Sequence, residues 1–154
     1  MREAGVLMPV SALPSRVGAG ELGESAFHFI ELLKKNHVRI WQILPLNPVG
    51  YGNSPYQPYS SCAGDDIYIS LDILAEEGLL KKSPMLFLEK CKKVDYERVR
   101  QYREPYLRAA FMAFVEQKGY EKPEYKEFAA QSWVYEYGVF RALKKANNGA
   151  CWNE

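Results

Sequence analysis

The chain has 154 residues, with 20 Lys and Arg against 19 Asp and Glu, and 47% of its residues are hydrophobic. This length and composition are those of a globular domain that can bury a core of its own. The net charge of +1 gives no electrostatic basis for binding nucleic acid or an anionic membrane, and no apolar stretch is long enough to span a bilayer.

The three cysteines are Cys62, Cys91 and Cys151. They are far apart in the sequence and odd in number, so they indicate neither a disulfide framework nor a metal knuckle. We expect free, buried thiols in a reducing compartment. The chain opens on Met-Arg-Glu-Ala-Gly, which contains no apolar leader core, and we therefore predict a cytoplasmic protein.

The first quarter of the chain predicts a strand–helix–strand unit. Residues 5–10 form a short apolar run that is typical of a buried strand, limited by Pro9. A loop over 11–23 leads to a predicted helix over 24–35, and residues 38–44 predict a second buried strand. Two strands joined by one helix are expected to be parallel.

The rest of the chain is predominantly helical. Residues 67–71 predict a short third strand, and residues 71–80 a helix. Further helices are expected over 84–92, 96–118, 123–130 and 132–146. Two or three parallel strands cannot bury both faces of a sheet, so this layout indicates the leading part of a longer α/β fold.

Two motifs argue against a nucleotide or metal cofactor. Gly18, Gly20 and Gly23 match a dinucleotide-binding pattern, but seven residues separate them from the first strand and no acidic residue ends the second. A glycine turn before a helix explains them better. His28 and His37 have no Cys or carboxylate at ligand spacing, so we predict no metal site and no cofactor.

No pair of catalytic carboxylates is evident. Glycosyl transfer needs two carboxyl groups that face each other across the reacting bond. Asp65 and Asp66 are adjacent, and adjacent residues of a strand point to opposite faces. Glu76 and Glu77 lie on a predicted helix surface. We therefore assign no catalytic residue.

The strongest local pattern is Tyr-Gly-Asn-Ser-Pro-Tyr-Gln-Pro-Tyr over residues 51–59. Pro55 and Pro58 stiffen this loop, which lowers the entropy lost on binding a ligand. The loop carries no charge, and it combines aromatic faces with neutral hydrogen-bonding groups, which suits a sugar chain. The rings are those of Tyr51, Tyr56 and Tyr59, and the polar groups those of Asn53, Ser54 and Gln57. The alternative is a proline-rich turn whose tyrosines fill gaps in packing.

These residues also carry a family resemblance. Gly-Val-Leu-Met-Pro-Val-Ser-Ala-Leu-Pro-Ser over 5–15, Trp-Gln-Ile-Leu-Pro-Leu over 41–46 and Gly-Tyr-Gly-Asn-Ser-Pro-Tyr-Gln over 50–57 resemble the 4-alpha-glucanotransferases of the alpha-amylase superfamily. The segment over 71–80 and the Phe-Arg-Ala-Leu-Lys helix over 140–144 are also similar. One departure is Asp65, where relatives commonly carry Asn.

The resemblance implies an α/β fold, namely the leading part of a (β/α)8 TIM-type barrel with a helical insertion subdomain. Such barrels run to about 250 residues or more. We expect residues 1–74 to supply the first barrel strands, with a sugar-cleft loop over 45–66, and residues 75–154 to form a mostly helical insertion that the C-terminus truncates.

The implied activity is transfer of an α-1,4-glucan segment between glucans with retention, by carboxylates that this chain lacks. The chain alone is therefore expected to be inactive, with the rest of its barrel as a partner and an α-1,4-glucan or maltooligosaccharide as ligand. By resemblance Tyr56 stacks on the sugar beside the reacting bond, Ser54 contacts hydroxyls and Tyr51 belongs to an outlying glucan site, with Asn53 and Gln57 as further contacts. A non-catalytic maltooligosaccharide-binding module and a helical interaction domain stay open as alternatives.

Overall fold

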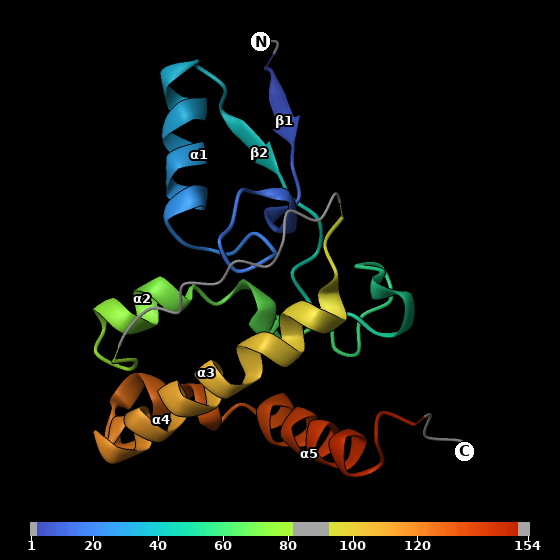
Figure 1. The fold of residues 1–154 in the computed structure, drawn as a ribbon, viewed down its shortest axis with the longest axis vertical. Helices are drawn as coiled ribbons and strands as arrows, with labels where there is room; N and C mark the ends of the chain where they lie inside the picture. The colour runs from blue at the N-terminus through green and yellow to red at the C-terminus, as the bar shows by residue number, and fades with distance from the viewer. Residues whose placement is uncertain (1–2, 82–92, 151–154) are drawn as a thin grey trace.

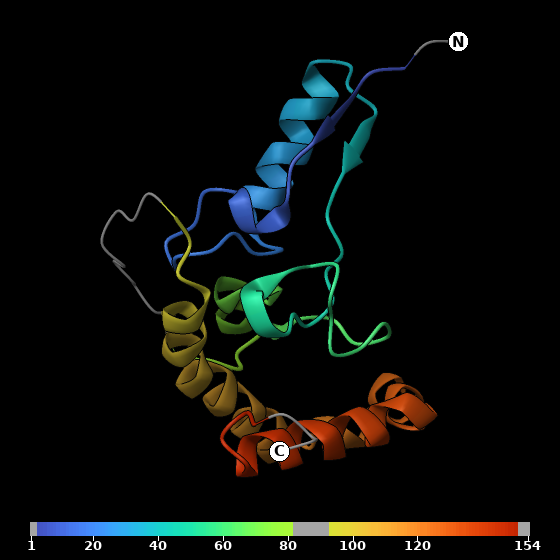
Figure 2. The same cartoon turned by 90° about the vertical axis from the view of Figure 1, so that its right-hand side faces the viewer.

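The computed structural model describes residues 3–81 and 93–150. A strand–helix–strand unit forms one end of the molecule, and a layer of helices forms the other (Figure 1). Both strands run toward the helical layer, and the loops that follow them lie between the two parts (Figures 1 and 2).

The strand–helix–strand unit is confirmed. Strand β1 (Gly5–Leu7) pairs in parallel with β2 (Ile40–Gln42), with Gly5 opposite Ile40, and α1 (Glu24–Lys35) connects them. Helix α1 packs on the sheet through an edge-to-face contact between Phe29 and Trp41 at 5.0 Å. The Trp41 indole N–H donates to the carbonyl of Met8 at 2.8 Å, which fixes the ring across the end of β1.

The strands differ from the prediction in length and burial. They are shorter than 5–10 and 38–44, and the 3-10 helix η1 (Val10–Ala12) turns the chain away directly after Pro9. They are also not buried, since Leu7 is 57% exposed and Ile40 45%. The cause is that α1 covers only one face of a sheet that has two strands among the described residues. On α1 itself, the apolar side chains of Phe27 and Ile30 are exposed.

The predicted strand over 67–71 is wrong. The 3-10 helix η3 (Asp66–Tyr68) lies there, because the Asp65 carboxylate accepts a hydrogen bond from the Ile67 N–H and turns the chain. Helix α2 (Leu71–Glu76) follows, with Ser70 as its N-cap. It ends at Glu76, earlier than the predicted residue 80, and Gly78 follows with a φ of +74° that an L residue rarely adopts.

The later helices are close to the prediction. They are α3 (Tyr96–Glu116), the 3-10 turn η4 (Gly119–Glu121), α4 (Pro123–Ala129) and α5 (Ser132–Ala146). The Asp95 carboxylate caps α3 by accepting from the Arg98 N–H, and α4 begins with Pro123 at its first position. The helix predicted over 84–92 lies outside the described residues.

The core is divided into three small clusters that meet around the first loop. Val17 packs with Leu71 of α2 and Ala110 of α3. Val10 and Leu13 pack with Ala26 of α1, and Ala19 packs with Ile67 and Val99. The loop over 11–23 therefore joins the sheet unit to the helices. No described helix is long and apolar enough to cross a membrane.

A tight backbone approach inside this loop generates a stability prediction. A Cβ added to Gly20 would lie 1.9 Å from the Val10 carbonyl oxygen. We expect Gly20→Ala to lower the free energy of unfolding by about 3 kcal/mol, because neither backbone segment can move freely. Urea denaturation followed by far-UV circular dichroism measures the change.

Gly138→Ala is the matched control. Gly138 lies inside α5, and a Cβ there meets nothing within 4 Å, so we expect about 1 kcal/mol of stabilisation from helix propensity. Equal stability of the two variants would contradict the close packing of the first loop.

Candidate functional site

The candidate site is the loop over residues 45–66, called here the tyrosine loop. It follows the carboxyl end of β2 and leads to η3. Figure 1 shows it in green beside the amino-terminal end of α3. In parallel α/β sheets this is the edge at which ligands bind.

Backbone hydrogen bonds fold the outer part of the loop into a hairpin. Val49 and Pro58 form an antiparallel bridge. The Gly50 N–H donates to the Gln57 carbonyl at 3.3 Å, and the Tyr59 N–H donates to the Pro48 carbonyl at 2.8 Å. The tip turns through the 3-10 helix η2 (Tyr51–Asn53), in which Gly52 has a φ of +77°.

The base of the loop is closed separately. The Asp65 N–H donates to the Leu46 carbonyl at 2.8 Å, and the Asn47 side-chain amide donates to the Ala63 carbonyl at 3.0 Å. Ser60 accepts from the N–H groups of Cys62 and Ala63 through its hydroxyl oxygen. The free thiol of Cys62 is exposed, which corrects the expectation of a buried one, because these hydrogen bonds turn its side chain outward on the loop surface.

The structure brings the predicted binding residues together at the hairpin tip. Tyr56 is 72% exposed, so its ring is available and is not part of a core. The Ser54 hydroxyl oxygen accepts from the Tyr56 N–H at 3.4 Å, which leaves its proton free to donate. Asn53 and Gln57 are exposed on the same turn. Tyr51 contributes its backbone to η2, while its side chain lies outside the described part of the structure.

Tyr59 has a different environment from Tyr56. Its ring lies 5.7 Å from that of Phe140 on α5, and the Lys144 ammonium lies 5.2 Å from the ring centre. Aromatic and cation–π contacts of this kind stabilise packing. Tyr59 therefore serves the loop's attachment to α5, which the sequence did not indicate.

The base of the loop is held by an ion pair that the sequence analysis also missed. Arg100 of α3 donates to both carboxylate oxygens of Asp65, at 2.7 and 2.5 Å. The Asp65 side chain is only 2% exposed, and it also accepts from the N–H groups of Ile67 and Val49. Asp66 receives a further contact from Arg100 at 3.2 Å.

These contacts set the ionisation of Asp65. Burial alone raises the pKa of this carboxyl, but the hydrogen bonds and charge of Arg100, with the two N–H donors, outweigh it and hold the pKa below its usual 3.8. In contrast, burial and the neighbouring Asp65 charge raise the pKa of Asp66. Arg100 thus forms ion pairs with both carboxyl groups.

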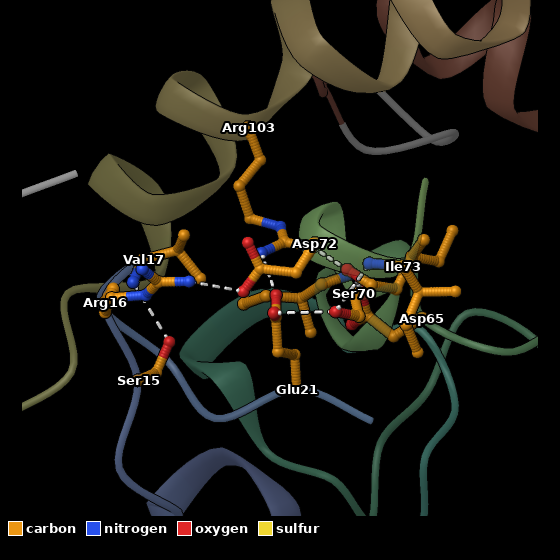
Figure 3. A network of polar contacts seen from close by, with 11 residues as sticks. Ser15, Arg16, Val17, Glu21, Asp65, Ser70, Asp72, Ile73 and Arg103 are labelled. Atoms are coloured by element: carbon orange, nitrogen blue, oxygen red, sulfur yellow. Dashed lines mark hydrogen bonds and ion pairs between the residues drawn. The ribbon is translucent and has the colours of Figure 1, made fainter. Parts of the chain in front are cut away.

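A second polar network joins the first loop to the helices. Arg103 of α3 is buried and donates to the Glu21 carboxylate at 2.9 Å and to the Ile69 carbonyl (Figure 3). Ser70 donates to Glu21 at 3.0 Å while capping α2.

The glycine motif contributes to this packing. The Gly20 N–H donates to the Ser11 carbonyl at 3.0 Å, and a Cβ on Gly23 would lie 2.6 Å from the Ser70 hydroxyl oxygen. Among the residues that the structure describes, no three His, Cys, Asp or Glu side chains are placed to hold a metal ion.

Fold and site together define an α/β protein whose tyrosine loop, at the carboxyl edge of the parallel strands, has an uncharged aromatic segment over residues 51–59. A family model described as 4-alpha-glucanotransferase matches residues 8–154. The chain belongs to the 4-alpha-glucanotransferase family, which confirms the resemblance carried by its motifs.

Comparisons with individual relatives support this family assignment. The chain is 41% identical to a 4-alpha-glucanotransferase of Synechocystis sp. and 38% identical to one of Thermus thermophilus, each alignment covering 99% of this chain and 31% of the relative. Its structure is similar to that of an amylomaltase from Streptococcus agalactiae in complex with acarbose, with a TM-score of 0.85 and 28% identity over 100% of this chain and 32% of that one. The chain thus spans about a third of the length of these relatives.

The ion pair at the loop base generates a prediction about pH. A carboxylate whose folded pKa is lowered contributes stability above its unfolded pKa, and that stability is lost as the pH falls through the folded pKa. We expect Asp65→Asn to lower the free energy of unfolding by about 2–3 kcal/mol at pH 7. The difference from the wild type should shrink below about pH 4, where the unfolded-state carboxyl titrates. Urea denaturation from pH 7 to pH 3 measures it.

Asp95→Asn is the control for this measurement, because Asn caps a helix as well as Asp does. Its stability should stay within about 0.5 kcal/mol of the wild type. An Asp65→Asn difference that is the same at pH 3 and pH 7 would rule out the ion pair as its source.

Proposed function

We propose that this chain supplies the substrate-binding loop of a 4-alpha-glucanotransferase, and that the whole protein transfers an α-1,4-glucan segment between glucans with retention. The observation that carries the proposal is the exposed Tyr56 ring, on a loop stiffened by Pro55 and Pro58 beyond β2. A flat ring beside neutral hydrogen-bonding groups suits a pyranose, which offers C–H groups to the ring and hydroxyls to the polar side chains. The amylomaltase of similar structure is in complex with acarbose, which is a saccharide analogue and so resembles the proposed glucan ligand.

Each tip residue has a proposed role. Tyr56 stacks on a glucose ring next to the reacting bond, and Ser54 donates its free hydroxyl proton to a sugar oxygen. Asn53 and Gln57 exchange hydrogen bonds with further hydroxyls. Tyr51 contributes to an outlying glucan site. The ligand is an α-1,4-glucan or maltooligosaccharide.

We also propose that β1 and β2 are the first strands of a (β/α)8 barrel. Residues 1–74 then belong to the barrel, and residues 75–154 to a helical insertion subdomain. The exposed Leu7 and Ile40 of the sheet support this arrangement, because further strands and helices would cover them. The partner of the chain is thus the remainder of its own barrel. The exposed free thiol of Cys62 suits a reducing compartment, and we propose a cytoplasmic location.

The reacting carboxylates belong to that remainder in this proposal. Retaining transfer needs two carboxyl groups about 5 Å apart across the glycosidic bond. Asp65 and Asp66 are both bound to Arg100, so they are unsuited to the task. The chain by itself is therefore expected to be inactive in transfer.

Tyr56→Ala tests the proposed role of the loop. The test enzyme is a hybrid in which this chain replaces the aligned segment of the Synechocystis relative. We expect Tyr56→Ala to lower the rate of maltosyl transfer from maltotriose, which releases glucose, at least tenfold, because loss of the ring removes about 1.5–3 kcal/mol of contact with the sugar. Glucose release measures the rate.

Tyr135→Ala is the matched control, since Tyr135 is 77% exposed on α5 and the same ring is removed. Its transfer rate should equal that of the parent hybrid. Unchanged transfer by the Tyr56→Ala hybrid would refute the assignment. Saturable binding of maltoheptaose by a hybrid without transfer would instead favour the non-catalytic binding module.

A further inference from the structure

Helices of the second half of the chain contact the tyrosine loop at two places. Arg100 of α3 holds its base through Asp65, and Phe140 and Lys144 of α5 hold Tyr59 at the foot of the hairpin. The residues at the tip, including Tyr56, make no comparable side-chain contact within the described part of the chain. The conformation of the tip thus depends on how firmly the base is held.

Asp65 is the point at which the loop is fixed. Its N–H donates to the Leu46 carbonyl, and its carboxylate accepts from the Val49 N–H, so both contacts reach the first part of the loop. The carboxylate also accepts from the Ile67 N–H in η3, directly after the loop. Arg100, 35 residues further along the chain, donates to both of its oxygens. A paired guanidinium fork of this kind fixes direction as well as distance.

The docking of α3 does not require Arg100. Val99 is buried against Ala19 and Ile67, and Arg103 holds Glu21 and the Ile69 carbonyl from the same helix. The Arg100 side chain, in contrast, is 27% exposed, and among the described residues its ion-pair partners are Asp65 and Asp66. Loss of Arg100 should therefore release the loop while leaving α3 in place.

We propose that Arg100, through Asp65, is a positioning residue that holds the tyrosine loop in its binding conformation. This inference rests on the proposed function for its biological meaning, since a loop ordered before binding loses less entropy when a glucan arrives. Its structural content is independent of the ligand. The pair sets the order of the hairpin over 48–59.

Amide hydrogen exchange by NMR on the full chain tests the proposal. In the wild type the N–H of Tyr59, bonded to the Pro48 carbonyl, should be protected. In Arg100→Gln we expect its protection to fall at least tenfold, while amides inside α1 keep theirs. Arg100→Lys should be intermediate, because it keeps the charge and loses the fork. Arg108→Gln makes the same change on α3 at a residue that forms no ion pair with Asp65 or Asp66, and it should match the wild type.

Two results would overturn the proposal. One is protection of the Tyr59 N–H in Arg100→Gln that equals its protection in the wild type and in Arg108→Gln, or no protection of this N–H in the wild type itself. The other is an equal loss of protection in the loop and in α1, which would show a general loss of stability. If Arg100→Gln does not fold, Asp65→Asn provides the second variant, since an amide oxygen can still accept from the Ile67 N–H.

An acarbose titration by calorimetry separates this proposal from the proposed function. Where the wild type binds, we expect a dissociation constant about tenfold higher for Arg100→Gln and unchanged for Arg108→Gln. A folded wild type that gives a flat titration would count against glucan binding by this chain. The exchange data would still decide whether Arg100 orders the loop.

Discussion

The arrangement of this chain depends on the buried guanidinium of Arg103. A buried charge is tolerated only when acceptors surround it, and Arg103 obtains them from the Glu21 carboxylate and the Ile69 carbonyl. Glu21 in turn accepts from Ser70, which caps α2. One side chain of α3 therefore determines where the first loop and the start of α2 lie (Figure 3). Arg100, three residues earlier on the same helix face, extends the same control to the tyrosine loop.

Features that depend on local sequence could be predicted. Helices α1 and α5 and the parallel strand–helix–strand unit required only short-range patterns, and the structure confirms these elements. The prediction of a strand over 67–71 is wrong, and its cause is a local side-chain contact. Its apolar spacing is compatible with a strand, but the Asp65 side chain caps the Ile67 N–H and favours a turn. Burial of β1 and β2 also failed, because it depends on what covers the sheet and not on the strands themselves.

The candidate site shows the same division. The uncharged aromatic character of residues 51–59 could be inferred from the sequence, and the exposed Tyr56 agrees with it. That Tyr59 packs on α5 while Tyr56 does not could not be inferred, since both stand beside a proline in one motif. The pairing of Asp65 with Arg100 spans 35 residues, and no periodic pattern in the sequence indicates it. Contacts between distant segments are set by packing, which a single sequence does not display.

The tyrosine loop and the two-stranded sheet differ in whether the contacts that each requires lie within this chain. The tyrosine loop receives its contacts from α3 and α5, which lie within the chain, so its conformation does not depend on further strands. The sheet is different, because two short strands with one covering helix leave Leu7, Ile40 and the outer face of α1 in contact with water. A two-stranded sheet is marginal unless other elements pack on it. In the proposed barrel, closure of the sheet would therefore bury the strands without having to shape the loop, and the binding surface would be formed before the reacting groups are brought to it.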